Sequence, residues 1–139
     1  MKFAQVIPVT DWQAATEDPA ALIACIPGVT AVEPIQTGLY RIQAVNGIGP
    51  VRLRLEGTAR LQRPAPNQLV AEVTLQDMAG TVYGIFRLTA QSDGIALDAD
   101  VTLGGRLGEF AQPLIRKRAE ETVRGFQQNL MARLGSSPS

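Results

Sequence analysis

The sequence predicts an α+β fold in which a curved antiparallel sheet of about seven strands wraps around one long C-terminal helix. Two observations carry this prediction. Apolar and polar side chains alternate through most of the chain, which is typical of strands with one buried face. After Gly104, apolar residues recur every three or four positions, which is typical of an amphipathic helix. A length of 139 residues, 45% of them apolar, favours one domain with a substantial core.

The first elements are a strand and two short helices. Alternation over residues 3–9 predicts the strand, and Pro8 favours a place at or near an edge of the sheet. Thr10 and Gln13 fit a capping box, so residues 11–15 should form a helix that carries Trp12 inward. Asp18 should cap a second helix, with Pro19 at its first position and Gly28 as a permissive exit residue.

A series of strands follows. Residues 51–62 give the clearest pattern, with leucines on one face and arginines on the other. Similar patterns recur over residues 69–75, 82–90 and 95–103, and turn-forming residues separate them. Consecutive strands joined by short turns predict an antiparallel meander.

The last predicted element runs from Gly104 or Gly105 to Leu134. Pro113 interrupts it, so either the helix kinks there or a short first turn is followed by a new helix. We expect a bend near Pro113. A long helix and two short ones can cover one face of the sheet, which is the helix-grip arrangement. We expect residues 1–135 to form this single domain and residues 136–139 to form a short flexible tail.

Composition excludes several classes of function. Thirteen basic and thirteen acidic residues cancel, so nucleic acid is not an expected partner. The absence of histidine excludes a Ser/His/Asp triad, a Cys/His pair and histidine metal sites; we expect no catalytic set, no metal and no cofactor. One cysteine, no signal peptide and no apolar run long enough to span a bilayer predict a cytoplasmic protein.

Three blocks of sequence resemble a known family. The first contains Trp12, Asp18, Pro19 and residues 24–28, which read Ala-Cys-Ile-Pro-Gly; the second, residues 45–51, contains Gly49 and Pro50; the third contains Gly104, Gly105, Leu107, Phe126 and Leu130. Together they resemble the carbon monoxide dehydrogenase G-subunit family (CoxG), within the SRPBCC superfamily of START, polyketide-cyclase and birch-pollen-allergen relatives. Pro113 and the short tail depart from the family pattern, and anchoring to a membrane by the tail is not expected.

The resemblance implies a deep apolar cavity between the concave face of the sheet and the long helix. It also implies an accessory role for a molybdenum carbon monoxide dehydrogenase, involving quinone and the inner face of the membrane. Small residues on the inward sheet face, such as Gly57, Ala71 and Gly84, would leave room for such a cavity, although larger neighbours could fill it. The candidate cavity residues are Trp12, Ile26, Tyr40, Leu53, Leu55, Val73, Phe86, Leu97, Val101, Leu107, Phe110 and Leu114.

The leading hypothesis is therefore non-enzymatic binding of a quinone- or lipid-like molecule, with a molybdenum hydroxylase subunit as partner and at most peripheral membrane association. The first alternative is a cyclase or aromatase, which needs an ionisable group in the cavity, and Arg87 is the candidate. The second is a protein-interaction adaptor with a filled core.

Other polar or reactive residues favour structural interpretations. Cys25 reads as a small buried hydrophobe, and Asp98 and Asp100 as solvent-facing strand residues. The basic residues at positions 116–118 could bind an anionic headgroup or an acidic partner. Glu120 and Glu121 can pair with neighbouring arginines, including Arg124, which favours solvated helix surface instead.

Overall fold

A computed structural model describes residues 1–48, 51–109 and 112–135 of the chain. Across these residues, seven strands form one antiparallel sheet in the order β1-β7-β6-β5-β4-β3-β2. The strands are β1 (Lys2–Ile7), β2 (Val29–Gln36), β3 (Leu39–Ile48), β4 (Val51–Gln62), β5 (Gln68–Asp77), β6 (Gly80–Gln91) and β7 (Gly94–Gly105). The helices are α1 (Trp12–Thr16), α2 (Pro19–Ala24), the 3-10 helix η1 (Arg106–Glu109) and α3 (Gln112–Gly135).

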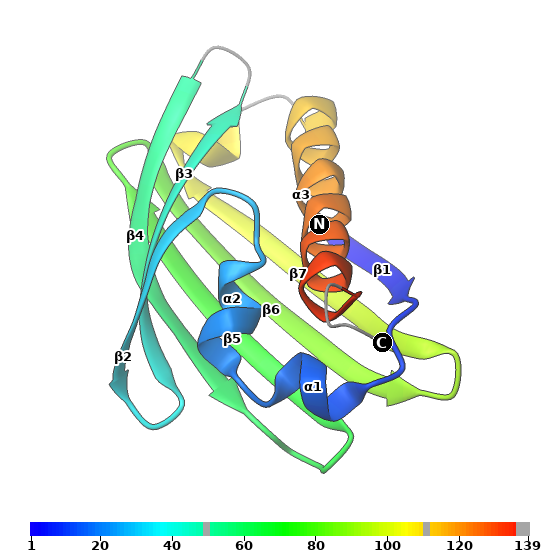
Figure 1. The fold of residues 1–139 in the computed structure, drawn as a ribbon. Coiled ribbons are helices and arrows are strands. Elements are labelled where there is room, and N and C mark those ends of the chain that lie inside the picture. The colour runs from blue at the N-terminus through cyan, green and yellow to red at the C-terminus, as the bar shows by residue number, and fades with distance from the viewer. Residues whose placement is uncertain (49–50, 110–111, 136–139) are drawn as a thin grey trace.

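The predicted helix-grip fold is confirmed. The sheet curves around α3, which lies along its concave side, and α1 and α2 cover the same side near the C-terminal end of α3 (Figure 1). Strands β2 to β7 form the predicted meander. The first strand closes the other edge by pairing with β7, with Lys2 opposite Asp100 and Ile7 opposite Ile95. The predicted edge position of the first strand is therefore confirmed.

The two short helices begin at aspartates. Asp11 Oδ1 accepts a hydrogen bond from the Ala14 backbone N–H at 3.1 Å, so α1 starts one residue later than predicted. The prediction of a capping box formed by Thr10 and Gln13 is therefore wrong, because the carboxylate of Asp11 caps the helix instead. The predicted second cap is confirmed: Asp18 Oδ1 accepts from Ala21 N–H at 3.2 Å, and Pro19 follows as the first helical residue.

Gly28 turns the chain from α2 into β2. Its φ is +91°, a backbone conformation that disfavours residues with a Cβ. A Cβ at this position would also collide with the Val45 carbonyl oxygen. The approach is close because the Gly28 carbonyl accepts a hydrogen bond from Val45 N–H at 2.8 Å. The turn predicted at Gly28 is confirmed, but α2 itself ends earlier, at Ala24 with Cys25 as its C-cap.

The C-terminal helix starts later than the sequence predicts. Gly104 and Gly105 belong to β7, where they pair with Thr81 and Gly80. Gly105 has a φ of +64° and ends the strand, after which η1 and then α3 follow. Pro113 lies in the first turn of α3, where its missing N–H removes no helical hydrogen bond. A single continuous helix from Gly104 or Gly105 is therefore wrong, and the alternative of a short first turn followed by a new helix is confirmed.

Helix α3 is held against the rest of the molecule near both ends. Leu130 is 1% exposed and packs with Leu22, Ile95 and other residues of α1, α2 and the sheet. Near the other end, Ile115 is 4% exposed and packs with Leu53 and Leu107. Arg133 adds hydrogen bonds from Nη2 to the carbonyl oxygens of Ala14 and Ala15 in α1. In the middle of α3, Gly125 lies close to Pro27, since a Cβ there would be 2.5 Å from the Pro27 Cγ, and Val123 and Phe126 pack against the same core as Leu130.

Candidate functional site

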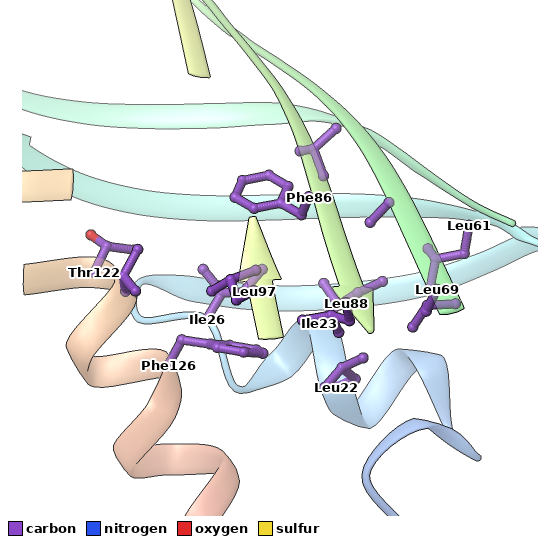
Figure 2. A pocket seen from close by; sticks show the side chains of 13 residues that line it. Leu22, Ile23, Ile26, Leu61, Leu69, Phe86, Leu88, Leu97, Thr122 and Phe126 are labelled. Carbon is purple, nitrogen blue, oxygen red and sulfur yellow. The ribbon is translucent and has the colours of Figure 1, made fainter. Parts of the chain in front are cut away.

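An inner cavity of about 110 Å³ lies between α2, the sheet and the middle of α3. Figure 2 shows its walls, with Leu22 and Ile23 from α2, Phe126 from α3 and Phe86 from β6. The lining residues are Leu22, Ile23, Ile26, Leu61, Leu69, Ala71, Val73, Phe86, Leu88, Leu97, Thr122, Val123 and Phe126. Among the described residues of this lining, Thr122 is the one polar side chain, and its hydroxyl donates to the Arg118 carbonyl oxygen at 2.9 Å. The inner cavity is therefore chemically apolar.

An outer cavity of about 180 Å³ lies next to it, towards the N-terminal end of α3. Its apolar lining includes Leu53, Leu55, Leu75, Val82, Val101 and Ile115. Its polar side chains are Asn46 from β3 and Arg118 and Thr122 from α3. This cavity therefore joins an apolar interior to a polar rim.

Phe86 lies at the boundary of the two cavities. Both cavities are lined by Ile26, Val73, Phe86, Thr122 and Val123, so they share one wall. The ring lies over Gly84, two residues earlier on the same strand face: a Cβ at Gly84 would lie 2.7 Å from the ring. Gly84 thus provides the room in which the ring lies. Apolar cavities of roughly 150 Å³ accommodate a benzene-sized molecule, so the two spaces together suit a longer apolar molecule.

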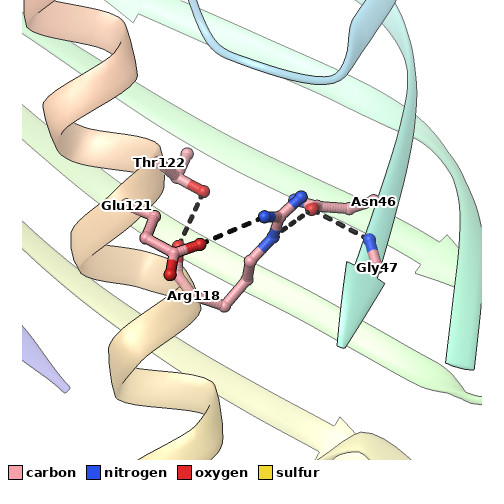
Figure 3. Close-up of polar contacts among 5 residues, drawn as sticks. All are labelled: Asn46, Gly47, Arg118, Glu121 and Thr122. Carbon is pink, nitrogen blue, oxygen red and sulfur yellow. Dashed lines mark hydrogen bonds and ion pairs between the residues drawn. The ribbon is translucent and has the colours of Figure 1, made fainter. Parts of the chain in front are cut away.

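Arg118 and Asn46 join α3 to β3 at the rim of the outer cavity (Figure 3). Arg118 Nε donates to Asn46 Oδ1 at 2.7 Å, and the Gly47 backbone N–H donates to the same oxygen at 3.0 Å. Arg118 Nη1 also pairs with Glu121 Oε2 at 3.3 Å. The Arg118 side chain is 42% exposed, so it contacts both the cavity and solvent.

The structure distributes the predicted cavity residues over several environments. Seven of them line the cavities: Ile26, Leu53, Leu55, Val73, Phe86, Leu97 and Val101. Leu107 is fully buried in the core beside the outer cavity. Trp12 donates from Nε1 to the Pro66 carbonyl oxygen at 2.9 Å, and Tyr40 packs around Ile42 and Ala59. Leu114 is 40% exposed, whereas Phe110, Gly49, Pro50 and the tail 136–139 lie outside the described residues.

The ionisable residue of the cavity is different from the one the sequence suggests. Arg87 is exposed and lies opposite Asp98 on the convex side of the sheet, so the expectation that it enters the cavity is wrong. Arg118 lines the outer cavity instead. The sequence favours a solvent-exposed position for it, because nearby glutamates can pair with its charge. A helical-spacing signal is present, because Arg118 is three residues after Ile115 and four before Thr122. Asn46 has a signal as well, because strand alternation puts it on the same face as the buried residues Ile42 and Ala44.

Other reactive groups lie away from both cavities. Cys25 is 6% exposed in the core between α1, α2 and α3, and burial raises the pKa of its thiol. Among the described residues, no Asp or Glu lines either cavity, and no group of three or more acidic or cysteine side chains could hold a metal ion. Asp98 and Asp100 are exposed, as predicted.

The sheet, the long helix and the two adjoining apolar cavities define a helix-grip protein. Residues 9–135 match the carbon monoxide dehydrogenase G-subunit family (CoxG). The chain belongs to this family, as its sequence blocks predict. A comparison with curated protein sequences gave no match.

Solved structures share the fold at low sequence identity. A conserved protein from Geobacillus kaustophilus is 20% identical with a TM-score of 0.77, over 98% of this chain and 93% of that one. A START superfamily protein from Mycobacterium smegmatis is 14% identical with a TM-score of 0.69, over 99% and 98% of the two chains. The ZhuI aromatase/cyclase from Streptomyces sp. R1128 is 10% identical with a TM-score of 0.63, over 96% and 91%.

Family and fold together suggest a protein that binds a hydrophobic ligand. Within the described residues, no helix has the length and apolarity that crossing a membrane requires.

Proposed function

We propose that this chain binds a quinone- or lipid-like molecule in its inner and outer cavities without transforming it chemically. The observation that carries the proposal is the pair of adjoining apolar cavities between the sheet and α3. Burial of apolar ligand surface against these side chains would supply most of the binding free energy.

The lining favours binding over catalysis. A cyclase needs an ionisable group that can act on a substrate inside the cavity. Arg87 lies outside, and among the described residues the cavity walls contain no carboxylate. Arg118 lies at the rim, and its guanidinium offers N–H donors and no acceptor, so it is suited to binding an oxygen atom rather than to acting as a base. The adaptor alternative expects a filled core, whereas these cavities contain space.

The family match supports a more specific role as an accessory protein to a molybdenum carbon monoxide dehydrogenase or a related hydroxylase. We place this role in the cytoplasm, at the inner face of the membrane. Co-purification with the subunits of such a hydroxylase tests the partnership independently of ligand binding. If the protein binds ligand but does not co-purify with the hydroxylase, the proposed partnership is wrong and the binding function still stands.

Native mass spectrometry and solvent extraction of the purified protein test the binding function directly. We expect extracted lipid or quinone, and saturable binding of a menaquinone or ubiquinone analogue by the emptied protein. Val123→Phe should weaken analogue binding because Val123 lines both cavities. Met131→Phe adds a ring to the exposed part of the same helix and is the matched control. A purified protein that carries nothing and binds neither analogue would disprove the proposed function.

A further inference from the structure

The polar rim gives the ligand site a direction. In the described part of the chain, Asn46 and Arg118 are the side chains of the outer cavity that can donate hydrogen bonds towards a ligand, because the Thr122 hydroxyl donates within α3. The inner cavity has no such donor among its described lining residues. A ligand that occupies both spaces therefore meets donors at one end and hydrocarbon at the other.

The hydrogen-bond pattern at the rim favours an acceptor group on the ligand. Asn46 Oδ1 receives two N–H donors, from Arg118 Nε and from Gly47. This fixes the orientation of the amide, so its Nδ2 remains a donor. Among the described residues, neither Asn46 Nδ2 nor Arg118 Nη2 has a hydrogen-bond partner. Two donors at the rim of an apolar cavity suit a carbonyl or carboxylate oxygen.

The existing partner of Arg118 does not block this role. Its ion pair with Glu121 is 3.3 Å long and joins side chains that are 42% and 43% exposed. Exposed ion pairs of this kind contribute at most about 1 kcal/mol, so a ligand oxygen can compete with Glu121 or share the guanidinium with it. The bond to Asn46 can persist, because Nε and Nη2 are separate donors.

We propose that the ligand is a chain-like amphiphile whose terminal carbonyl or carboxylate oxygen is bound by Arg118 and Asn46, while its apolar chain passes Phe86 into the inner cavity. This inference rests on the proposed function and adds the ligand's polar group and its orientation. Ala71 and Leu69 of β5 line the inner cavity but not the outer one, so they should contact the far end of the chain.

Competition against a neutral fluorescent probe tests the polar end. The probe is N-phenyl-1-naphthylamine, and the competitors are dodecanoic acid, its methyl ester and dodecane. Arg118→Met keeps an apolar stem and should weaken dodecanoic acid about tenfold, as expected for the loss of a charged hydrogen bond. Binding of the neutral probe and of dodecane should change less than twofold. Lys117→Met removes the same charge from an exposed neighbour and is the matched control.

The methyl ester separates the two sources of the acceptor. A loss for the acid alone assigns a carboxylate, as in a fatty acid, whereas a similar loss for the ester assigns a neutral carbonyl, as in a quinone. If Arg118→Met binds the acid and the ester as tightly as the native protein does, the inference is wrong while the proposed function stands. A native protein that binds no probe or competitor would overturn both.

Chain length tests the orientation. Ala71→Phe fills part of the inner cavity and should weaken hexadecanoic acid about tenfold, the equivalent of two methylene groups left in water, while octanoic acid keeps its affinity. Ala71→Leu is a smaller change for use if the phenylalanine variant unfolds in urea too early. Equal losses for the short and the long acid would show that the chain does not enter the inner cavity from the rim.

Discussion

Arg118 has two environments along the length of its side chain. It lines the outer cavity, yet it is 42% exposed and pairs with Glu121 at the surface. Long cationic side chains commonly cover apolar surface with their methylene groups and keep the charge in water. At this position the same behaviour places a permanent positive charge at the rim of an apolar space without burying it.

Cys25 contributes to stability rather than to binding. Its side chain is 6% exposed, lines neither cavity, and its thiol donates to the Ala21 carbonyl oxygen at 3.4 Å. Cys25→Ser should lower the free energy of unfolding by about 1 kcal/mol, because a hydroxyl is costlier to bury than a thiol. Urea titration measures this loss. Ligand affinity should remain within twofold, and a folded variant without binding would show that the cysteine serves the site.

Asp77 ties the β5–β6 hairpin to β4. Its Oδ1 accepts from Ala79 N–H and its Oδ2 from Arg54 N–H, both at 2.8 Å, and these bonds hold the pKa of the carboxyl below its usual value. Because the folded pKa is lowered, the stabilisation is present above the unfolded pKa and is lost as the pH falls through the folded pKa.

Asp77→Asn should therefore reduce stability at pH 7, and the difference from the native protein should shrink at pH 3 and below. Urea midpoints measured at both pH values check this result. Asp93→Asn changes an exposed acid with no hydrogen bond or ion pair assigned in the described structure and provides the comparison. A constant difference across the pH range would show that the carboxylate charge is not what stabilises the hairpin.

Residue patterns predict inward faces better than they predict polar contacts across the cavity. Leu53, Val73 and Phe86 are predictable cavity residues because alternation fixes the face of a strand. Helical spacing also puts Arg118 on the face of Ile115 and Thr122, but its neighbours Glu120 and Glu121 offer it a local partner and favour a solvent-facing interpretation. Its contact with Asn46 joins residues 72 positions apart, and this distance in sequence is set by the sheet rather than by local spacing.

Two glycine-containing segments have different roles at the scale of the element. Gly104 and Gly105 extend β7, although the sequence predicts the start of a helix there. Pairing with β6 keeps both glycines in the strand. The apolar spacing that follows them does not show where β7 ends. Gly84 lies within β6 and leaves room for a ring.

Gly84→Ala should displace the Phe86 ring, because the added Cβ would lie 2.7 Å from it. Overpacking of this kind costs about 1–3 kcal/mol of unfolding free energy. The double variant with Phe86→Leu should recover much of the loss, and urea titration of all four proteins in the cycle measures the coupling.

Gly104→Ala is the matched control, because its Cβ would meet nothing closer than the Thr81 Cβ at 3.8 Å. It should change stability by less than the Gly84 variant. Additive losses in the double variant would mean that the ring is not held by the absence of a side chain at position 84.

At the scale of the whole molecule, the fold class is predictable from the sequence and the cavities are less so. Period-two alternation and one amphipathic helix are sufficient for a sheet gripping a helix. The volume depends on how far α3 lies from the sheet, and its contacts at Ile115, Gly125 and Leu130 set this distance. These attachments depend on tertiary packing, which local spacing does not reveal.

A bound ligand should stabilise the entire fold by mass action. Protein stripped of lipid by unfolding and refolding should have a lower urea midpoint than protein purified without unfolding. An added ligand at one hundred times its dissociation constant should restore about 2.7 kcal/mol. Val123→Phe should respond less, because the ring occupies space that the ligand needs. Identical midpoints with and without ligand would exclude binding to the folded state.

The pairing of β1 with β7 also determines when the native sheet can be completed. Lys2 meets Asp100 and Ile7 meets Ile95, so this ladder joins segments separated by most of the chain. Closing such a loop costs entropy before any contact is gained, and folds rich in distant strand pairs refold in milliseconds to seconds. During synthesis, β1 must wait until β7 has been made, and its unpaired edge is available to other chains throughout that interval.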